Sequence, residues 1–173
     1  TMLEHFQGAD GFYDTGDYHE KLITRPREIQ DTATPSGNAM AVTVLLELGD
    51  LAMNQEYSNL ATSLLQRMQP LMRQYPLGFS QWLSALVYAM SPTREIAIVG
   101  DPAHEQTRAL LDVCRKGFRP HQVLAMSTPD GDGRSVPLSQ NRPQVRGQAT
   151  AYVCIESTCR PPVVDPIVLE ALL

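Results

Sequence analysis

The sequence has few lysines and no cluster of basic residues. Lys21 and Lys116 are the only lysines among fourteen basic residues, and the formal net charge of the 173-residue chain is -5. Binding to nucleic acid depends on clustered Lys and Arg side chains that neutralise phosphates. A polybasic membrane attachment needs a similar cluster. The composition therefore argues against nucleic acid and against a membrane surface as partners.

Long apolar runs and signal-peptide features are also missing. No apolar segment approaches the ~20 residues that span a bilayer as a helix. The first twelve residues, TMLEHFQGADGF, have neither the basic region nor the apolar core of a secretory signal. We expect the chain to be part of a longer one. Three cysteines, an odd number, do not resemble the disulfide framework of a secreted mini-domain, so we expect a reducing, cytoplasmic setting.

The cysteines do not match a redox or metal motif. Cys154 and Cys159 are five residues apart, which is not the C-x-x-C spacing, and no second Cys/His pair accompanies them. We therefore expect no metal and no cofactor. The favoured interpretation is a buried thiol at Cys154 and an incidental one at Cys159. A disulfide stays open, because it requires Cβ atoms within about 4.5 Å. A redox role is the weakest functional hypothesis.

Three long helices are predicted in the first half of the chain. Residues 36–49 and 79–90 are apolar on nearly every face, whereas residues 54–75 are apolar on one face only. A helix that is apolar all round is buried between other elements, so we expect Met40, Val44 and Leu86 in the core. The order buried, amphipathic, buried favours an (α/α) barrel with inner and outer helices. A four-helix bundle would make its helices similarly amphipathic.

The second half of the chain predicts shorter elements in this order: strand 95–100, helix 103–116, strand 122–127, surface loop 129–143, strand 149–155 and helix 166–173, capped by Asp165. The first three form a βαβ unit with parallel strands. The segment after the first strand lacks both the G-x-G-x-x-G of a dinucleotide fold and the GK[ST] of a P-loop. We interpret the unit as structural.

Charged side chains gather in two loops before the helix that begins at Ser36. The first loop carries Asp10, Asp14, Asp17, His19 and Glu20, and the second carries Arg25, Arg27, Glu28 and Asp31. Backbone N–H groups at the helix start favour an anionic or hydroxyl-bearing ligand, which indicates a binding site there. The structural alternative stays open: Asp and Gly form turns, Ser36 caps the helix, and an Arg–Asp pair holds the loop.

Three segments carry a family resemblance: GFYDTGDYHEKLITRPREIQDTATPSGNAMA, EIAIVGDP and GQATAYVCIESTCRPPVVDP. They resemble the C-terminal part of the spermatogenesis-associated protein 20 family, also called YyaL-like proteins, in the family's order. The resemblance implies a thioredoxin-like domain elsewhere in the full-length protein. It also implies a six-hairpin helical barrel, similar to those of N-acylglucosamine 2-epimerases and six-hairpin glycosidases. Three long helices would supply only the last hairpins of that barrel.

The resemblance also implies a ligand and its site. In the sugar-active relatives, acidic and aromatic residues at the barrel mouth hold the sugar. The matching positions here are Asp14, Asp17, His19, Arg25, Arg27, Asp31, Ser36 and Asn38. An enzyme of this kind would be carbohydrate-active, epimerase-like or glycosidase-like. No catalytic residue is assigned, because glycoside hydrolysis needs two carboxyl groups at a defined separation and epimerisation needs acid and base groups on opposite sides of the substrate.

The predicted fold is mainly α with a small α/β element: a partial (α/α) six-hairpin barrel over residues 1–92 and a βαβ-containing element over residues 93–173. The predicted function is that of a C-terminal fragment that binds or processes a sugar-like ligand. The alternative is a non-catalytic scaffold or interaction module. Expected partners are a sugar-like small molecule and the remainder of the full-length chain or another copy, since exposed apolar flanks favour association.

Overall fold

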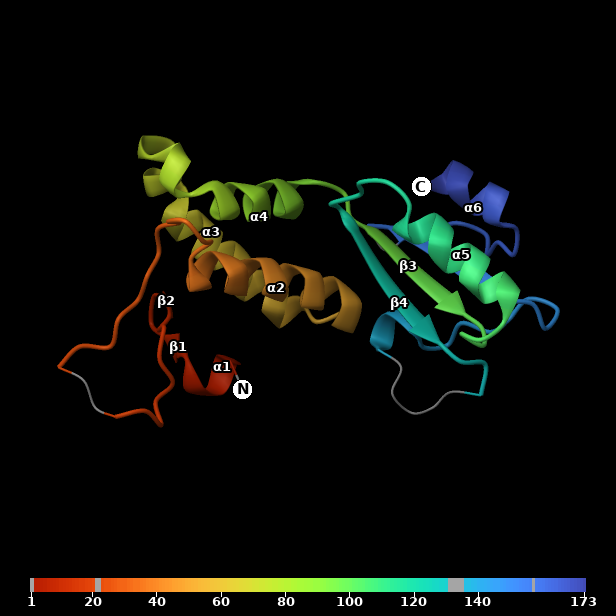
Figure 1. Ribbon diagram of the computed structural model, residues 1–173, viewed down its shortest axis with the longest axis horizontal. Coiled ribbons are helices and arrows are strands. Elements are labelled where there is room, and N and C mark those ends of the chain that lie inside the picture. The colour runs from red at the N-terminus through yellow and green to blue at the C-terminus, as the bar shows by residue number, and fades with distance from the viewer. Residues whose placement is uncertain (1, 21–22, 131–135, 157) are drawn as a thin grey trace. The chain divides into compact units, whose positions relative to one another are not determined.

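The computed structural model describes residues 2–20, 23–130, 136–156 and 158–173. The chain forms two compact units (Figure 1), each with its own core. The first, called the helical unit, comprises residues 1–47 and 55–90, and the second, called the sheet unit, comprises residues 48–54 and 91–173.

The helical unit contains these elements in chain order: α1 (Met2–His5), β1 (Gln7–Gly8), β2 (Gly11–Phe12), most of α2 (Gly37–Ala52), α3 (Gln55–Gln74), η1 (Pro76–Gly78) and α4 (Ser80–Met90). The strands β1 and β2 form a short antiparallel pair. As predicted, Ser36 caps α2, because its Oγ accepts the backbone N–H of Ala39 at 3.2 Å. Helix α3 continues through Pro70.

The core of the helical unit lies among α2, α3 and α4. Helix α3 buries one face, which confirms its predicted amphipathic character, whereas Trp82 of α4 is almost fully enclosed. The buried apolar side chains of this core are Phe12, Ala39, Ala41, Val42, Leu45, Leu46, Ala61, Leu64, Leu65, Met72, Phe79, Trp82, Ala85 and Tyr88. Phe12 of β2 belongs to this core, so its side chain anchors the segment before α2 on the helices.

The sheet unit is built on four strands in the order β4-β3-β5-β6. Strand β3 (Arg94–Val99) runs parallel to β4 (Gln122–Ser127), with α5 (Glu105–Arg115) between them in the chain, which confirms the predicted βαβ unit. On its other edge β3 pairs antiparallel with β5 (Thr150–Ile155), which pairs antiparallel with the short β6 (Thr158–Cys159). The remaining elements are η2 (Pro137–Ser139) and α6 (Pro166–Leu172), capped by Asp165 as predicted.

Both faces of this sheet are covered. Alternate residues of β3 point to opposite faces, so Ile96 and Ile98 pack with Leu110 of α5 and Leu169 of α6, while Ala97 faces the other side with Val123, Ala125 and Leu138. Figure 1 shows α5 lying along the sheet. A strand covered on both faces reads as a continuous apolar run, and residues 96–99 of β3 do so.

The prediction of a mainly α, partial six-hairpin barrel is wrong. Alongside the helices, a four-stranded sheet organises one of the two units of the described chain. This is a mixed α/β architecture. The three predicted helices are present, but their order along the chain does not define a ring. Local periodicity fixes which face of a helix is apolar, and it does not fix what that face meets.

The expected burial of two helices is also wrong in part. Met40 and Val44 of α2 are 42% and 39% exposed, and Leu86 of α4 is only half-buried. Val87 and Met90 of α4 are exposed as well, at 54% and 77%. Each helix therefore buries one face in the helical unit and leaves apolar side chains on another. An all-apolar helix needs two covered faces, and the described residues cover only one.

Among the parts of the chain that the structure describes, no helix combines the length and apolar character that crossing a membrane requires.

Candidate functional site

The two polar loops of the helical unit converge on the start of α2. The carboxylate of Asp14 accepts the backbone N–H of Glu28 at 2.9 Å, so the two loops are joined to each other. A Cβ atom at Gly37, the first residue of α2, would lie 3.9 Å from Asp14 Oδ1. Four of the predicted site residues, Asp14, Asp31, Ser36 and Asn38, are thus brought to this helix end.

Asn38 lies inside the protein rather than at a mouth. Its side chain is 2% exposed, and its amide oxygen accepts the backbone N–H of Phe12 at 2.7 Å. Its amide nitrogen donates to the carbonyls of Phe12 at 2.8 Å and Glu28 at 2.9 Å. All three bonds are intramolecular, so the amide fastens both polar loops to α2.

Asp31 joins two helix starts. One carboxylate oxygen accepts the backbone N–H of Ser36 at 2.9 Å, next to α2, and the other accepts the N–H of Gln81 in the first turn of α4 at 2.8 Å. The N–H of Asp31 itself donates to Gly78 at 2.8 Å. Helix starts carry unsatisfied N–H groups that favour a carboxylate. Asp31 of the same chain supplies that carboxylate here, in the place that an anionic ligand could take.

The other predicted site residues lie around the loops. The Arg25 guanidinium donates to the carbonyls of His5 and Thr15 and lies over the ring of Tyr13, with 4.1 Å to its centroid. Asp17 contacts His5, with 2.9 Å between Oδ1 and Nδ1. His19 is exposed and stacks on Tyr18, and Arg27 is exposed. The structure therefore does not gather all eight side chains into one cavity.

A small open pocket of about 220 Å³ lies beside Asp31. Its walls come from the loop before α2, from η1 and from α4, and hydroxyl and amide groups dominate them. The lining residues are Asp31, Thr32, Ala33, Thr34, Pro35, Leu77, Ser80, Gln81 and Ser84. Thr43 of α2 reaches the same region, because its hydroxyl accepts the Gln81 side-chain amide at 3.0 Å. This pocket can offer hydrogen bonds to a small hydroxylated molecule.

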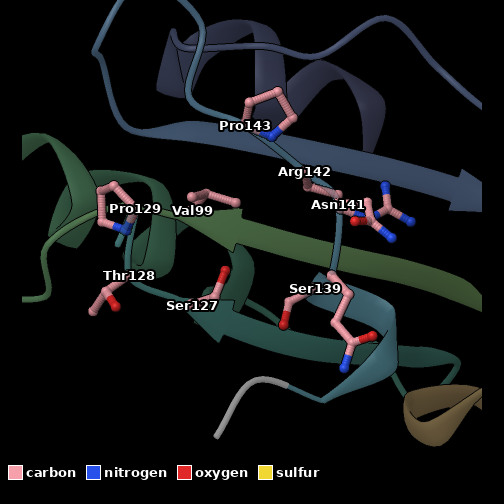
Figure 2. Close-up of a pocket in the computed structure, with 9 residues that line it drawn as sticks. Val99, Ser127, Thr128, Pro129, Ser139, Asn141, Arg142 and Pro143 are labelled. Atoms are coloured by element: carbon pink, nitrogen blue, oxygen red, sulfur yellow. The ribbon is translucent and has the colours of Figure 1, made fainter. Parts of the chain in front are cut away.

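A larger pocket, of about 600 Å³, lies in the sheet unit at the carboxyl ends of the parallel strands (Figure 2). Val99 ends β3 and Ser127 ends β4, followed by Thr128 and Pro129. Figure 2 shows the segment from Ser139 to Pro143 crossing the other side of the pocket. Ligands of open α/β sheets bind at this edge of the strands, so the position is a suitable one for a small polar ligand.

Arg142 is one of the residues that line this pocket. Its Nε donates to the carbonyl of Leu138 at 2.7 Å, and its guanidinium lies over the ring of Tyr152, with 5.2 Å to the centroid. Partial burial raises the pKa of the Tyr152 phenol, and the nearby Arg142 charge opposes that rise. The same guanidinium contacts the sulfurs of Cys154 and Cys159, which form a disulfide. Of the two alternatives for these cysteines, the disulfide is the one present, and the interpretation of two separate thiols is wrong.

The pocket in the sheet unit was not predicted from the sequence. The available signal was the βαβ pattern, whose parallel strands bring Val99 and Ser127 to one edge. The missing glycine motifs argued only against nucleotides, and the unit was interpreted as structural. The second wall, residues 139–143, comes from the loop that was predicted as surface. No local pattern indicates that this loop returns to the strand ends.

This is a two-unit α/β protein with polar, ligand-sized surface pockets. Across the described ranges, no group of three or more His, Cys, Asp or Glu side chains is arranged to hold a metal ion. No family model matches the chain.

Curated proteins resemble the chain over most of its length. The chain is 29% identical over 172 residues to spermatogenesis-associated protein 20 of Homo sapiens and 29% identical over 171 residues to that of Rattus norvegicus. The protein of Mus musculus is 27% identical over 172 residues. Each match covers 96% of this chain, and the chain spans only 21–22% of each relative. The family resemblance predicted from the motifs, to spermatogenesis-associated protein 20, is confirmed.

Proposed function

We propose that this chain is a non-catalytic interaction module, the C-terminal fragment of a longer protein of this family. The observation that carries the proposal is a set of exposed apolar side chains on α2 and α4, namely Met40, Val44, Val87 and Met90, which we call the helical apolar surface. These side chains are 42%, 39%, 54% and 77% exposed. We also propose that the module acts in the cytoplasm.

The helical apolar surface favours association by ordinary hydrophobic burial. Covering apolar area contributes about 25 cal/mol for each Å² removed from water, and exposed apolar patches mark interaction sites on soluble proteins. The curated relatives are four to five times longer than the matched region. We therefore take the remainder of the full-length chain as the partner, and association with a second copy as the alternative.

The polar residues near α2 support a non-catalytic role. The side-chain polar atoms of Asn38 and both carboxylate oxygens of Asp31 are engaged with backbone groups of the same chain. Catalytic groups need access to the reacting atoms of a substrate. Side chains that hold loops on helices give rigidity instead, and a rigid surface favours binding.

The test is binding between this chain and the separately produced remainder of its longer natural protein, measured by calorimetry. We expect a 1:1 complex that the double variant Val44→Ser/Val87→Ser weakens at least about tenfold, because two apolar contacts are lost. Leu77→Ser is the matched control: Leu77 is 93% exposed on η1, outside the helical apolar surface. Light scattering of the chain alone tests the second-copy alternative. A monomeric chain with no affinity for the remainder would contradict the proposal.

A sugar-like ligand is the second candidate, favoured by the hydroxyl-lined pocket beside Asp31. Saccharides are recognised by convergent hydrogen bonds in a site of limited size. Titration calorimetry with a panel of monosaccharides tests this candidate. We expect Ser84→Ala to lower affinity several-fold without lowering the melting temperature, because Ser84 is an exposed lining residue. Absence of binding heat with every sugar would rule the candidate out.

A further inference from the structure

The disulfide of the sheet unit joins a buried cysteine to an exposed one. Cys154 of β5 and Cys159 of β6 are register partners in the antiparallel pair, and their sulfurs are bonded. Cys154 is 1% exposed, whereas Cys159 is exposed on the strand at the edge of the sheet. A thiolate from solution therefore has access to the Cys159 side of the bond.

Arg142 lies against the enclosed sulfur. Its Nη1 and Nη2 atoms are each 3.4 Å from Cys154 Sγ, and they are 3.9 Å and 4.0 Å from Cys159 Sγ. The bond to Leu138 and the contact with Tyr152 hold the guanidinium in this position. A cation beside a sulfur stabilises its thiolate form. In thiol–disulfide exchange, a more stable leaving thiolate departs faster.

We propose that Cys154–Cys159 is an exchange-active disulfide that small thiols reduce in the folded protein, with Arg142 stabilising the departing Cys154 thiolate. A thiolate attacks Cys159 Sγ, the Cys159–Cys154 bond breaks, and its electron pair goes to Cys154 Sγ. A second thiolate then attacks the small thiol's sulfur in the mixed disulfide and releases the Cys159 thiolate. The protein gains two electrons, two thiols become one small disulfide, and the protons of those thiols pass to solvent or to the cysteines.

The third cysteine supplies an internal comparison. Cys114 of α5 is 4% exposed within the core of the sheet unit, and burial raises its pKa to about 11. A buried thiol with a raised pKa is a poor nucleophile. The proposed exchange therefore belongs to the pair beside Arg142 and does not involve the other cysteine.

The predicted setting agrees with an exchangeable bond. In a reducing compartment, persistent structural disulfides are rare, and those present are mostly transient, catalytic or redox-sensing. The proposal is independent of the interaction-module function, because it concerns the sheet unit and the helical apolar surface belongs to the helical unit.

The first experiment measures reduction of the folded chain by glutathione, with alkylation and mass spectrometry to count free thiols. We expect two thiols to appear under conditions where circular dichroism shows the chain folded. Arg142→Gln should slow reduction about three- to tenfold, while Arg142→Lys restores part of the rate, because the leaving thiolate loses and then regains a cation. Arg160→Gln removes an exposed charge next in sequence to Cys159 and should leave the rate unchanged.

The second experiment separates the two sulfurs by single substitutions, using oxidised glutathione as the probe. With Cys154→Ser, we expect a mixed disulfide on Cys159 within minutes. With Cys159→Ser, the enclosed Cys154 should react at least about tenfold more slowly. The proposal is overturned if the native disulfide is reduced only when the chain unfolds, if Arg142→Gln and Arg160→Gln reduce at the same rate, or if both single-cysteine variants react equally fast.

Discussion

The side-chain amide of Asn38 forms hydrogen bonds to both the backbone N–H and the backbone C=O of Phe12, at 2.7 Å and 2.8 Å. The amide thus pairs with β2 as the backbone of a neighbouring strand would, although Asn38 belongs to the first turn of α2. Gly11 makes this approach possible, because a Cβ atom there would lie 2.6 Å from Asn38 Oδ1. The position of Phe12 in the helical core therefore depends on a residue 26 positions away.

Removal of this amide should destabilise the helical unit strongly. Asn38→Ala leaves the Phe12 N–H and two backbone carbonyls without their partner, inside the protein or close to its surface. The two bonds to Phe12 are buried, and an unsatisfied buried polar group costs about 1–3 kcal/mol, so we expect the free energy of unfolding to fall by about 2–6 kcal/mol. Urea unfolding followed by circular dichroism measures the change.

Ser36→Ala is the matched control for Asn38→Ala. It removes a single capping bond at the same helix start, and loss of such a cap costs about 1 kcal/mol. If the two variants lost equal stability, Asn38 would act only as a local helix-start residue and not as the connection between the loops.

Asp31 and Arg27 should differ sharply when each is replaced by alanine. Asp31→Ala removes the acceptor of two backbone N–H groups, those of Ser36 and Gln81, and we expect a loss of about 2–3 kcal/mol. Arg27→Ala changes an exposed residue and should stay within about 0.5 kcal/mol. Urea midpoints of the two variants decide this. A loss at Arg27 as large as that at Asp31 would contradict the structural role described for Asp31.

Periodicity predicted local elements well and long-range partners poorly. Three predictions that depend on residues within a few positions of one another are confirmed. They are the one-sided apolar face of α3, the βαβ order around β3, and the helix caps at Ser36 and Asp165. The barrel depended on assuming partners for the apolar faces of α2 and α4. The described residues do not cover those faces, and Met40 and Met90 remain exposed. The composition of a helix alone does not show whether a partner covers it.

The candidate site shows the same limit. The sequence predicts charged loops near the start of α2, and in the structure Asp14 and Asp31 lie there. It gave no indication that Asn38 points inward, because its partners Phe12 and Glu28 are 26 and 10 residues away. The contact between Arg142 and the disulfide likewise joins positions 12 and 17 residues apart. Such contacts follow from tertiary packing, which spacing does not encode.

Glu95 of β3 should make stability depend on pH in the acid range. Burial raises its pKa above 4.5, the Asp50 charge adds to the rise, and Arg142 opposes it. A carboxyl whose folded pKa is raised destabilises the protein once pH exceeds that pKa and has no effect below the unfolded value. Glu95→Gln should therefore stabilise the chain at pH 7 by a few tenths of a kcal/mol, after allowance for solvent screening, and leave it unchanged at pH 4.

Urea unfolding of wild type and Glu95→Gln at pH 4 and pH 7 measures this difference. Asp50→Asn removes the neighbouring like charge while keeping Glu95, and part of the gain at pH 7 should appear. An equal gain for Glu95→Gln at both pH values would show that the effect comes from packing rather than from ionisation.

Cys114 should make stability depend on pH in the alkaline range. Burial raises its pKa from 9.0 to about 11, and the charges of Arg119 and Arg115 oppose the rise. Between these values the unfolded chain releases a proton that the folded chain keeps, so the free energy of unfolding falls as pH rises from 9 to 11. The full effect is about 2–3 kcal/mol.

Cys114→Ala provides the comparison that isolates this thiol, because lysines and tyrosines also titrate in the same range. The variant should be less stable than wild type at pH 7, since it removes a buried side chain. The stability difference should then shrink as pH rises through 9 towards 11, because only the wild type incurs the cost of keeping the thiol protonated. Urea unfolding at steps of one pH unit measures the two curves, and parallel curves would show that the Cys114 thiol does not titrate differently in the folded and unfolded chain.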